Sequence, residues 1–238
     1  MMQNSYIALD LETTGLRPTS DKILEIGAVK VENGQITGTY ETFVDCGVVI
    51  PCRITQLTGI TEEMVKGSPG LSDAVDGFLA FSGELALLGH NLIFDYSFMK
   101  QSIVNLGGTY ERQGLDTLAI ARRCLPELEG KSLDRLAAYY RIPQEHHHRA
   151  LDDAITASRL YERMKEEFAG QRPEIFSPVP LIYKPRKESP ITISQKRYLH
   201  DLIKYHRIES NVKIELLTKS EASRMIDGII LQYGKIVR

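Results

Sequence analysis

The sequence predicts an α/β domain with a mixed β-sheet flanked by helices, followed by a small helical module. Three observations lead to this fold class. The chain opens with three apolar segments separated by turn signals, strand and helix patterns then alternate, and a proline-rich stretch around residue 180 precedes two further helical patterns. Three antiparallel strands followed by strand–helix units are typical of a mixed sheet covered by helices.

The first three strands are expected at residues 5–12, 22–32 and 35–44. Residues 5–12 are mostly apolar, as in a central strand that is covered on both faces. Asn33-Gly34 separates the second segment from the third, and this dipeptide is a strong short signal for a hairpin. The three segments therefore predict an antiparallel meander.

Helices and strands alternate in the following part of the chain. The expected order is a helix at 71–81, a strand at 85–89, a helix at 95–106, a short strand before Asp116, a helix ending near Cys124, a helix capped by Ser132, and a long helix at 150–168. Gly107-Gly108 ends the helix at 95–106, as glycines after a helix commonly do. The strands of this part extend the sheet.

The sequence divides into a first domain at residues 1–170, a linker at 171–190 and a small helical module at 191–238. Half of the ten prolines fall between residues 173 and 190, which favours an extended, semi-rigid connector. The module is expected to contain helices at 194–206 and 220–233, the second with a capping box formed by Thr218 and Glu221.

The composition is that of an ordinary globular protein, with 42% hydrophobic residues. The cysteines Cys46, Cys52 and Cys124 form no CxxC pair, which favours reduced thiols in a cytoplasmic protein over a disulfide framework. The sequence contains no signal-peptide pattern and no run of about 18 apolar residues, so we expect a cytoplasmic location and no membrane association.

Charge is distributed unevenly. Residues 1–170 carry 16 Lys and Arg against 24 Asp and Glu, a net charge of -8, and residues 171–238 carry 13 against 7, a net charge of +6. A basic tail can contact a phosphate backbone, and charge alone does not separate this role from solvated helices. In the helix at 194–206 the solvated interpretation is favoured over a stacking and phosphate surface made of Tyr198, Tyr205, Lys196, Arg197, Lys204 and Arg207.

Asp10 and Glu12 lie two residues apart at the end of the first expected strand, so their side chains point to the same face. Two such carboxylates repel each other unless a cation lies between them, and Mg²⁺ and Mn²⁺ prefer these oxygen ligands. An Asp-x-Glu pair alone is more often a solvated strand end. Here Thr13-Thr14-Gly15 follows, where Gly15 suits a tight turn and the hydroxyls and amides can approach a nucleotide.

Asp95 begins a helix after an apolar strand, and two interpretations of it stay open. It is a metal ligand, or it complements the helix N-terminus as a capping acid. His90 and Asn91 are expected to hold the preceding turn by side-chain hydrogen bonds. Phe94, taken alone, is more often a core residue than a platform for a base.

His148 and Asp153 lie five residues apart at the start of the long helix. A histidine on the loop before this helix can remove a proton from a metal-bound water. His146 and His147 precede it, and a histidine triplet can also be a weak metal-binding tract. Asp152 faces about 100° away from Asp153 on the helix, toward solvent or a salt bridge.

These fragments resemble the three motifs of the DEDDh exonucleases, also called the DnaQ-like family. Asp10 and Glu12 match the first motif, Asp95 in HNLIFD matches the second, and His148 and Asp153 in HRALDDA match the third. The resemblance covers about residues 5–168. Together with LTGIT at 57–61 and LDTLAIARR at 115–123, it is most similar to the proofreading exonucleases of bacterial DNA polymerase III, in their epsilon-subunit and PolC-embedded forms.

The resemblance implies a ribonuclease H-like fold and a 3'-5' exonuclease that releases nucleoside 5'-monophosphates. It implies that two Mg²⁺ or Mn²⁺ ions, roughly 3.5–4 Å apart, are held by Asp10, Glu12, Asp95 and Asp153, with His148 as the general base. The expected substrate-binding residues are Thr13, Thr14, Gly15, Asn91 and Phe94. The expected partners are nucleic acid 3' ends, with DNA favoured over RNA, and a DNA polymerase or other protein at the C-terminal module.

Two alternatives stay open. The first is an RNA exonuclease of the same family, because no residue shows whether a 2'-hydroxyl is accepted. The second is a non-catalytic nucleic-acid-binding module that keeps the fold. Loss of one ligand would support this module, and none of the five motif residues is missing.

Overall fold

The computed structural model describes residues 4–144, 149–186, 189–209 and 212–236. Its contacts divide the chain into two compact units. The first consists of Met1–Cys46 and Pro51–Pro185, and the second consists of Gly47–Ile50 and Arg186–Arg238. Among the described residues, no helix has both the length and the apolar character needed to cross a membrane.

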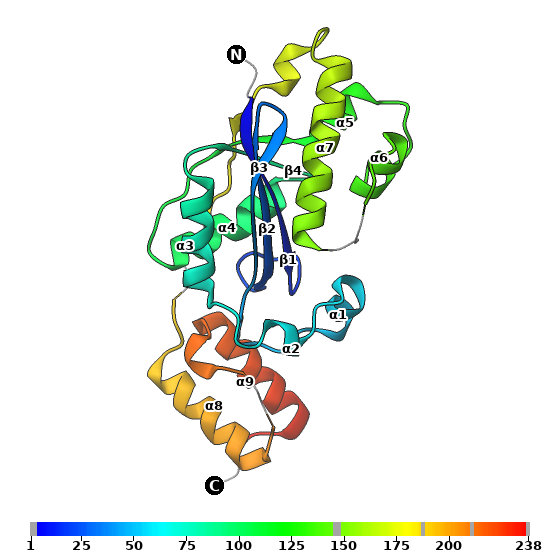
Figure 1. The fold of residues 1–238 in the computed structure, drawn as a ribbon. Helices are drawn as coiled ribbons and strands as arrows, with labels where there is room; N and C mark the ends of the chain where they lie inside the picture. The colour runs from blue at the N-terminus through cyan, green and yellow to red at the C-terminus, as the bar shows by residue number, and fades with distance from the viewer. Residues whose placement is uncertain (1–3, 145–148, 187–188, 210–211, 237–238) are drawn as a thin grey trace. The chain divides into compact units, whose positions relative to one another are not determined.

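The first unit is built on a six-stranded mixed sheet of order β3-β2-β1-β4-β5-β6 (Figure 1). The strands are β1 (Ser5–Thr13), β2 (Ile23–Glu32), β3 (Gln35–Phe43), β4 (Ala86–Gly89), β5 (Gln113–Asp116) and β6 (Val179–Pro180). β1, β2 and β3 are antiparallel, β4 and β5 continue the sheet in parallel to β1, and β6 is antiparallel to β5. The predicted meander and mixed sheet are confirmed.

The hairpin between β2 and β3 follows directly from its two turn residues. Asn33 and Gly34 both have positive φ angles, 52° and 77°. A two-residue turn of this kind matches the right-handed twist of the flanking strands. The turn therefore sets β2 antiparallel to β3 with Glu32 paired to Gln35.

Helices cover both faces of the sheet (Figure 1). The helices are α1 (Cys52–Thr58), α2 (Glu62–Val65), α3 (Leu71–Ser82), α4 (Ile93–Asn105), α5 (Thr117–Cys124), α6 (Leu133–Tyr139), α7 (Ala150–Phe168) and the short 3-10 helix η1 (Pro173–Phe176). Side chains of α5, α6 and α7 share one core cluster with one face of the sheet. Side chains of α3 and α4 share a second cluster with the opposite face. α1 and α2 were not predicted from the sequence.

Successive side chains of β1 point alternately to the two helical layers that cover the sheet. Tyr6 and Ala8 pack in the cluster of α7, and Ile7 and Leu9 pack in the cluster of α4. Because side chains alternate along a strand, Asp10 and Glu12 continue the row of Tyr6 and Ala8. The strand thus directs both acids toward the layer that contains α7.

Part of the stretch expected as a linker belongs to the first unit instead. Phe176 is fully buried in the cluster of α7, and Leu181 and Tyr183 pack against the cluster of α4. Pro180 lies in β6, at the edge of the sheet, where a strand tolerates a missing N–H. These apolar side chains outweigh the proline signal, and the division between the units falls after Pro185, not at residue 171.

The second unit is a small helical structure with its own core. It contains α8 (Ile193–His206), the 3-10 helix η2 (Ile214–Leu216) and α9 (Lys219–Tyr233). Its buried residues are Leu199, Leu202, Ile214, Leu217, Ala222 and Ile229. The predicted capping box of Thr218 and Glu221 is confirmed, and Thr192 with Gln195 forms a second one at α8.

Candidate active site

Three carboxylates converge where β1 meets the start of α7. Asp10 and Glu12 come from β1, and Asp153 comes from the first turn of α7. Each can offer an oxygen atom such that the three oxygens lie within 4.8 Å of one another. All three side chains are partly exposed, so the group is accessible from outside. Side chains separated by 143 residues in the sequence thus form one acidic cluster that is suited to a cation.

Asp95 reaches the same strand from the opposite layer. It lies in the first turn of α4 and is only 3% exposed. Its Oδ1 accepts a hydrogen bond of 3.1 Å from the backbone N–H of Leu11, the residue between Asp10 and Glu12. Asp95 is not the N-cap of its helix, since Leu92 holds that position without a side-chain bond. The acid is therefore fixed to β1 beside the cluster.

The acids raise one another's pKa. Desolvation is the largest cause for Asp10, followed by the charges of Asp95 and Asp153, and its pKa lies well above the ordinary value. For Glu12, desolvation and then the charge of Asp153 raise the pKa to about 7. Desolvation also raises the pKa of Asp95, against the opposing effect of the backbone N–H donors. Clustered acids of this kind favour a bound cation, which removes their mutual repulsion.

The turn after β1 uses the polar groups of Thr13 and Thr14 internally. The Thr13 hydroxyl donates to the Gly15 carbonyl at 2.6 Å, and the Thr14 hydroxyl accepts from the Lys22 N–H at 2.8 Å. A Cβ atom at Gly15 would lie 2.5 Å from a carboxylate oxygen of Asp21, so a larger residue there would displace the Asp21 side chain. The two hydroxyls thus build the turn, and their approach to a nucleotide stays a prediction.

The turn before α4 is held by His90 as the sequence led us to expect. Its Nδ1 lies 2.8 Å from the Thr117 hydroxyl and its Nε2 lies 2.8 Å from the Lys131 carbonyl oxygen. Burial lowers the pKa of His90, which favours the neutral ring in this structural role.

Asn91 and Phe94 occupy the same end of α4. Asn91 adopts a positive φ of 65°, its side chain is exposed, and its backbone N–H donates to Asp116 at 2.9 Å. Its expected side-chain bond is therefore replaced by a backbone bond. Phe94 is half-buried, with its ring centroid 5.0 Å from that of Phe98. Their contact with substrate stays a prediction.

His148, the expected general base, lies outside the described residues, as do His146 and His147. The described chain resumes at Arg149, one residue later. The role of His148 therefore rests on its motif and stays a prediction.

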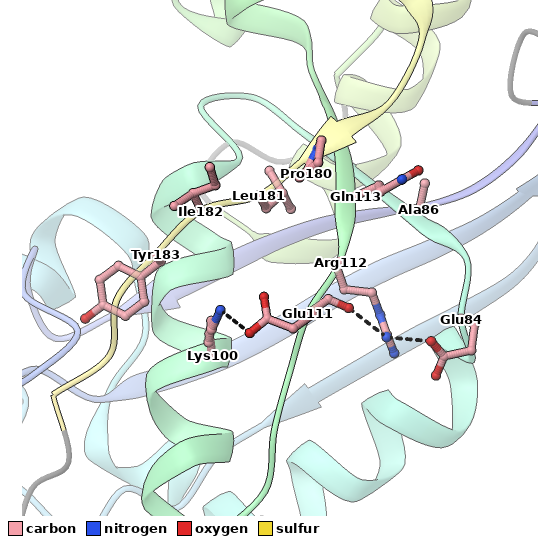
Figure 2. Close-up of a pocket in the computed structure, with 10 residues that line it drawn as sticks. All are labelled: Glu84, Ala86, Lys100, Glu111, Arg112, Gln113, Pro180, Leu181, Ile182 and Tyr183. Carbon is pink, nitrogen blue, oxygen red and sulfur yellow. Dashed lines mark hydrogen bonds and ion pairs between the residues drawn. The ribbon is translucent and has the colours of Figure 1, made fainter.

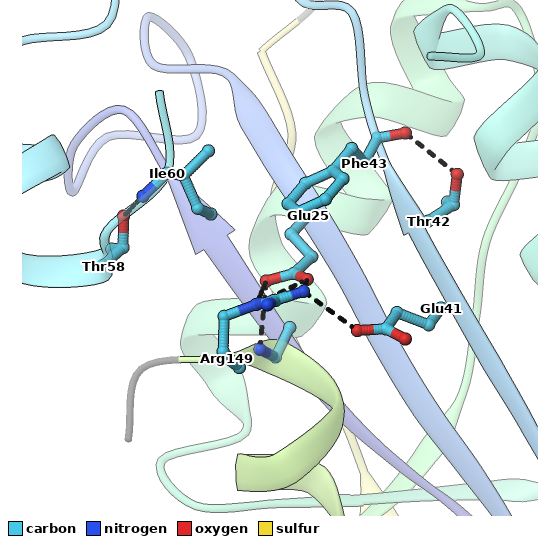
Figure 3. Close-up of polar contacts among 8 residues, drawn as sticks. Glu25, Glu41, Thr42, Phe43, Thr58, Ile60 and Arg149 are labelled. Atoms are coloured by element: carbon cyan, nitrogen blue, oxygen red, sulfur yellow. Dashed lines mark hydrogen bonds and ion pairs between the residues drawn. The ribbon is translucent and has the colours of Figure 1, made fainter. Parts of the chain in front are cut away.

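Two residues near the cluster were missed by the sequence reasoning. Glu25 of β2 is fully buried and forms an ion pair of 2.7 Å with Arg149, which immediately precedes α7 (Figure 3). The signal was present in the sequence, since Glu25 is a single acid inside the apolar strand ILEIGAV. A buried charge of this kind requires a partner.

A separate open pocket of about 490 Å³ lies where β5 and β6 meet α4 (Figure 2). None of the clustered acids lines it. Its two buried cations already have carboxylate partners: Lys100 pairs with Glu111 at 2.7 Å, and Arg112 pairs with Glu84 at 2.9 Å. This pocket therefore lacks the convergent acids that metal-assisted phosphodiester chemistry uses.

A mixed sheet flanked by helices, with carboxylates clustered at one of its strands, is typical of nucleases that bind divalent cations. The family model described as RNase_T, Exonuclease, matches residues 7–161, and the chain belongs to this exonuclease family. The predicted relationship to the DnaQ-like enzymes and the predicted enzymatic class are thereby confirmed.

Curated relatives include the PolC-type DNA polymerases III. The chain is 40% identical over 168 residues to that of Clostridium perfringens, an alignment that covers 69% of this chain and 12% of the relative. It is 34% identical over 253 aligned positions to that of Caldanaerobacter subterraneus subsp. tengcongensis, covering 100% of this chain and 18% of the relative. The chain thus spans less than a fifth of the length of these polymerases.

Solved exonuclease structures share the fold. Exonuclease X in complex with 5' overhanging duplex DNA has a TM-score of 0.58 and 25% identity, and the match covers 72% of this chain and 99% of that one. An E. coli exonuclease I complex with single-stranded DNA has a TM-score of 0.65 at 17% identity, covering 73% and 42% of the two chains. The predicted ribonuclease H-like arrangement is confirmed.

Proposed function

We propose that the chain removes nucleoside 5'-monophosphates stepwise from the 3' end of DNA, with single-stranded or mismatched ends as the preferred substrates. The observation that supports this most directly is the convergence of Asp10, Glu12 and Asp153 within 4.8 Å. Hard carboxylate oxygens at this spacing suit Mg²⁺ or Mn²⁺. The raised pKa of Glu12, about 7, indicates a site whose acids gain from a bound cation.

In this proposal Asp10, Glu12, Asp95 and Asp153 hold two divalent cations. When bound, such cations lower the pKa of a water molecule and stabilise the leaving 3' oxygen. The carboxylates fix where the attacking water and the scissile phosphate lie, and the fixed positions of β1, α4 and α7 limit reorganisation during the reaction. His148 accepts the proton that the water loses.

The proposed substrate follows the relatives. The PolC-type proteins are DNA polymerases, and the Exonuclease X structure is a complex with DNA. We propose that DNA is also the substrate of this chain. We propose further that residues 191–238 bind a DNA polymerase or another protein. A role in DNA replication or repair, in the cytoplasm, belongs to the same proposal.

The experiment that tests this function uses the purified chain and oligonucleotides labelled at the 5' end or at the 3' nucleotide. With Mn²⁺, the 3' label is expected to appear at once as a mononucleotide, and the 5' label is expected in a ladder of shortening products. The EDTA control is expected to release nothing. Release of the 5' label first, or release in EDTA, would contradict the proposal.

A single digestion that contains competing DNA and RNA strands tests which of the two is the preferred substrate. DNA degraded first supports the proposal, and RNA degraded first identifies an RNA exonuclease of the same family. Metal-independent binding with no release of nucleotide from either strand would identify a non-catalytic binding module. A comparison of paired with mismatched 3' ends then tests whether the enzyme prefers frayed termini.

A further inference from the structure

The start of α7, which holds Asp153, is joined to β2 by an ion pair between the fully buried Glu25 and the partly exposed Arg149. We propose that Glu25 and Arg149 are positioning residues, which hold the first turn of α7 so that Asp153 meets Asp10 and Glu12 at metal-binding distance. The idea rests on the proposed function, because it assigns these two residues to the same metal site. They touch neither metal nor substrate and act through Asp153.

Glu25 has no solvent exposure, and protein donors occupy its carboxylate (Figure 3). Arg149 donates from Nη2 to Oε1 at 2.7 Å and from Nε to Oε1 at 3.1 Å. The backbone N–H of Ala150 donates to Oε2 at 3.2 Å. Arg149 is the N-cap residue of α7 and makes no side-chain cap bond of its own. A carboxylate from a neighbouring strand therefore satisfies one of the N–H groups that the first turn of a helix leaves without an intrahelical partner.

The same residue is bonded directly to the metal-binding acid. The Arg149 carbonyl oxygen accepts the first helical hydrogen bond, 3.0 Å long, from the Asp153 N–H. The connection therefore runs from the Glu25 carboxylate through Arg149 to the backbone of Asp153. A shift of Arg149 changes the position of Asp153 even when the rest of α7 stays packed.

β2 meets α7 at the two positions that pair with the acids of β1. Gly27 is the partner of Asp10 in the β1–β2 register, and Glu25 is the partner of Glu12. A Cβ atom at Gly27 would lie 2.1 Å from the backbone of Ala150, so the helix rests directly on the strand there. The two ligands of β1 and the two contact points of α7 thus share adjacent positions in one sheet.

Arg149 is held from a second strand as well. Its Nη2 lies 3.1 Å from Oε1 of Glu41 in β3, and its guanidinium carbon lies 5.2 Å from the ring centroid of Phe43 (Figure 3). A planar guanidinium can serve two carboxylates and an aromatic face together, and a lysine ammonium cannot reproduce this geometry.

Desolvation of Glu25 offsets part of its attraction to Arg149, so the intact pair is weak evidence for a purely stabilising role. Removing one partner of such a pair is itself destabilising, so folding has to be measured beside metal affinity. Residues that orient metal ligands without touching the metal typically change metal affinity about 10–100-fold when they are replaced. The expected signature is therefore a weakened metal site in a folded protein.

The test compares Arg149→Lys and Glu25→Gln with the matched control Arg163→Lys. Arg163 lies on the same helix and forms an exposed pair with Glu166. Mn²⁺ binding is measured directly by electron paramagnetic resonance, alongside kcat and KM on a short oligonucleotide and circular dichroism. For both test variants we expect Mn²⁺ affinity and kcat each to fall about 10-fold or more, KM to change less than about 3-fold, and high Mn²⁺ to restore part of kcat.

Wild-type Mn²⁺ affinity and kcat in folded test variants would overturn the proposal. So would losses that follow the unfolded fraction and do not respond to added Mn²⁺, since they would show a purely structural pair. An equal loss in Arg163→Lys would also overturn it. Mn²⁺ binding is measured without turnover, so the two proposals can fail separately. A wild-type protein that binds Mn²⁺ but degrades nothing refutes the exonuclease function, and the Mn²⁺ affinities of the variants still decide the positioning role.

Discussion

Acidic residues at neighbouring positions of β1 and β2 have different surroundings. The first group is Glu25 of β2 alone, and the second is Asp10 and Glu12 of β1 together with Asp153. Glu25 is compensated from within the chain, by the Arg149 guanidinium and the Ala150 N–H. Burial raises the pKa of Asp10 and of Glu12, its neighbours across the strand pair. The charges of Asp95 and Asp153 add to this effect at Asp10, and the charges of Asp153 and Glu25 add to it at Glu12. The first group has the contacts of a structural ion pair, and the second has the electrostatics of a metal site.

The difference shows that acidity alone does not mark a functional residue. What separates the groups is the charge of the nearest partners and the access to solvent. Glu25 is sealed from solvent, whereas Asp10, Glu12 and Asp153 remain partly exposed. A cation from solution can reach only the second group.

The strongest way to break this comparison is to remove an acid of the metal site. We expect Asp10→Ala or Asp153→Ala to lower kcat by about 10³-fold or more, because the cation that activates water loses a ligand. The metal-free variant is expected to melt at the same or a higher temperature, since less negative charge is clustered. Nucleotide release and differential scanning fluorimetry measure the two effects.

Asp152→Ala is the matched control for Asp153→Ala, because it removes an acid from the adjacent residue of the same helix turn. Its activity is expected to stay much closer to that of the wild type, because Asp152 is not one of the three clustered carboxylates. An active Asp153→Ala protein would remove the distinction between the two groups of acids.

His148→Ala removes the expected general base and leaves the carboxylates in place. We expect kcat to fall by about 10²-fold or more with unchanged Mn²⁺ affinity, since a positioned base contributes about that much. The rate of the wild type is expected to rise with pH as the imidazole loses its proton, and the variant is expected to lack this limb. A pH–rate profile from pH 6 to 9 measures both, and identical profiles would contradict the role.

The pH dependence of stability sharpens the comparison without any mutation. An acid whose pKa is higher in the folded protein binds more protons when folded, so the free energy of unfolding falls as pH rises between the two values. For Glu12 this window runs from 4.5 to about 7. We expect the Tm of the metal-free protein to fall across this window, by about 2–4 °C for each kcal/mol of stability lost.

Added Mn²⁺ should oppose this loss, because the cation binds the deprotonated acids and stabilises the folded state. Glu12→Gln is the control, and its metal-free Tm should fall less over the same window. A metal-free Tm that rises from pH 4.5 to pH 7 would show that the acids are not crowded as the structure has them. Scanning fluorimetry in EDTA and in Mn²⁺ gives all four curves.

The sequence predicted most of the sheet and the acids that converge on it, because both depend on local patterns. Period-2 spacing placed Asp10 and Glu12 on one face, and Asn33-Gly34 placed the hairpin. The pairing of Glu25 with Arg149 could not be predicted, because the two residues are 124 positions apart and no local pattern indicates which residue is the partner of Glu25. The linker was misplaced for a related reason: the packing of Phe176 depends on a cluster made by distant segments.

Every partner described above for the two groups of acids lies in the first unit, so removing residues 186–238 should have the smallest effect. We expect residues 1–185 to fold and to degrade short oligonucleotides within about 2-fold of the full chain, because the truncation keeps β6, Phe176 and the segment Gly47–Ile50. Residues 1–170 lack the buried Phe176 ring, and removal of a core phenylalanine costs about 3–5 kcal/mol. The shorter protein should therefore unfold at lower urea, and a loss of activity in folded 1–185 would show that the second unit completes the site.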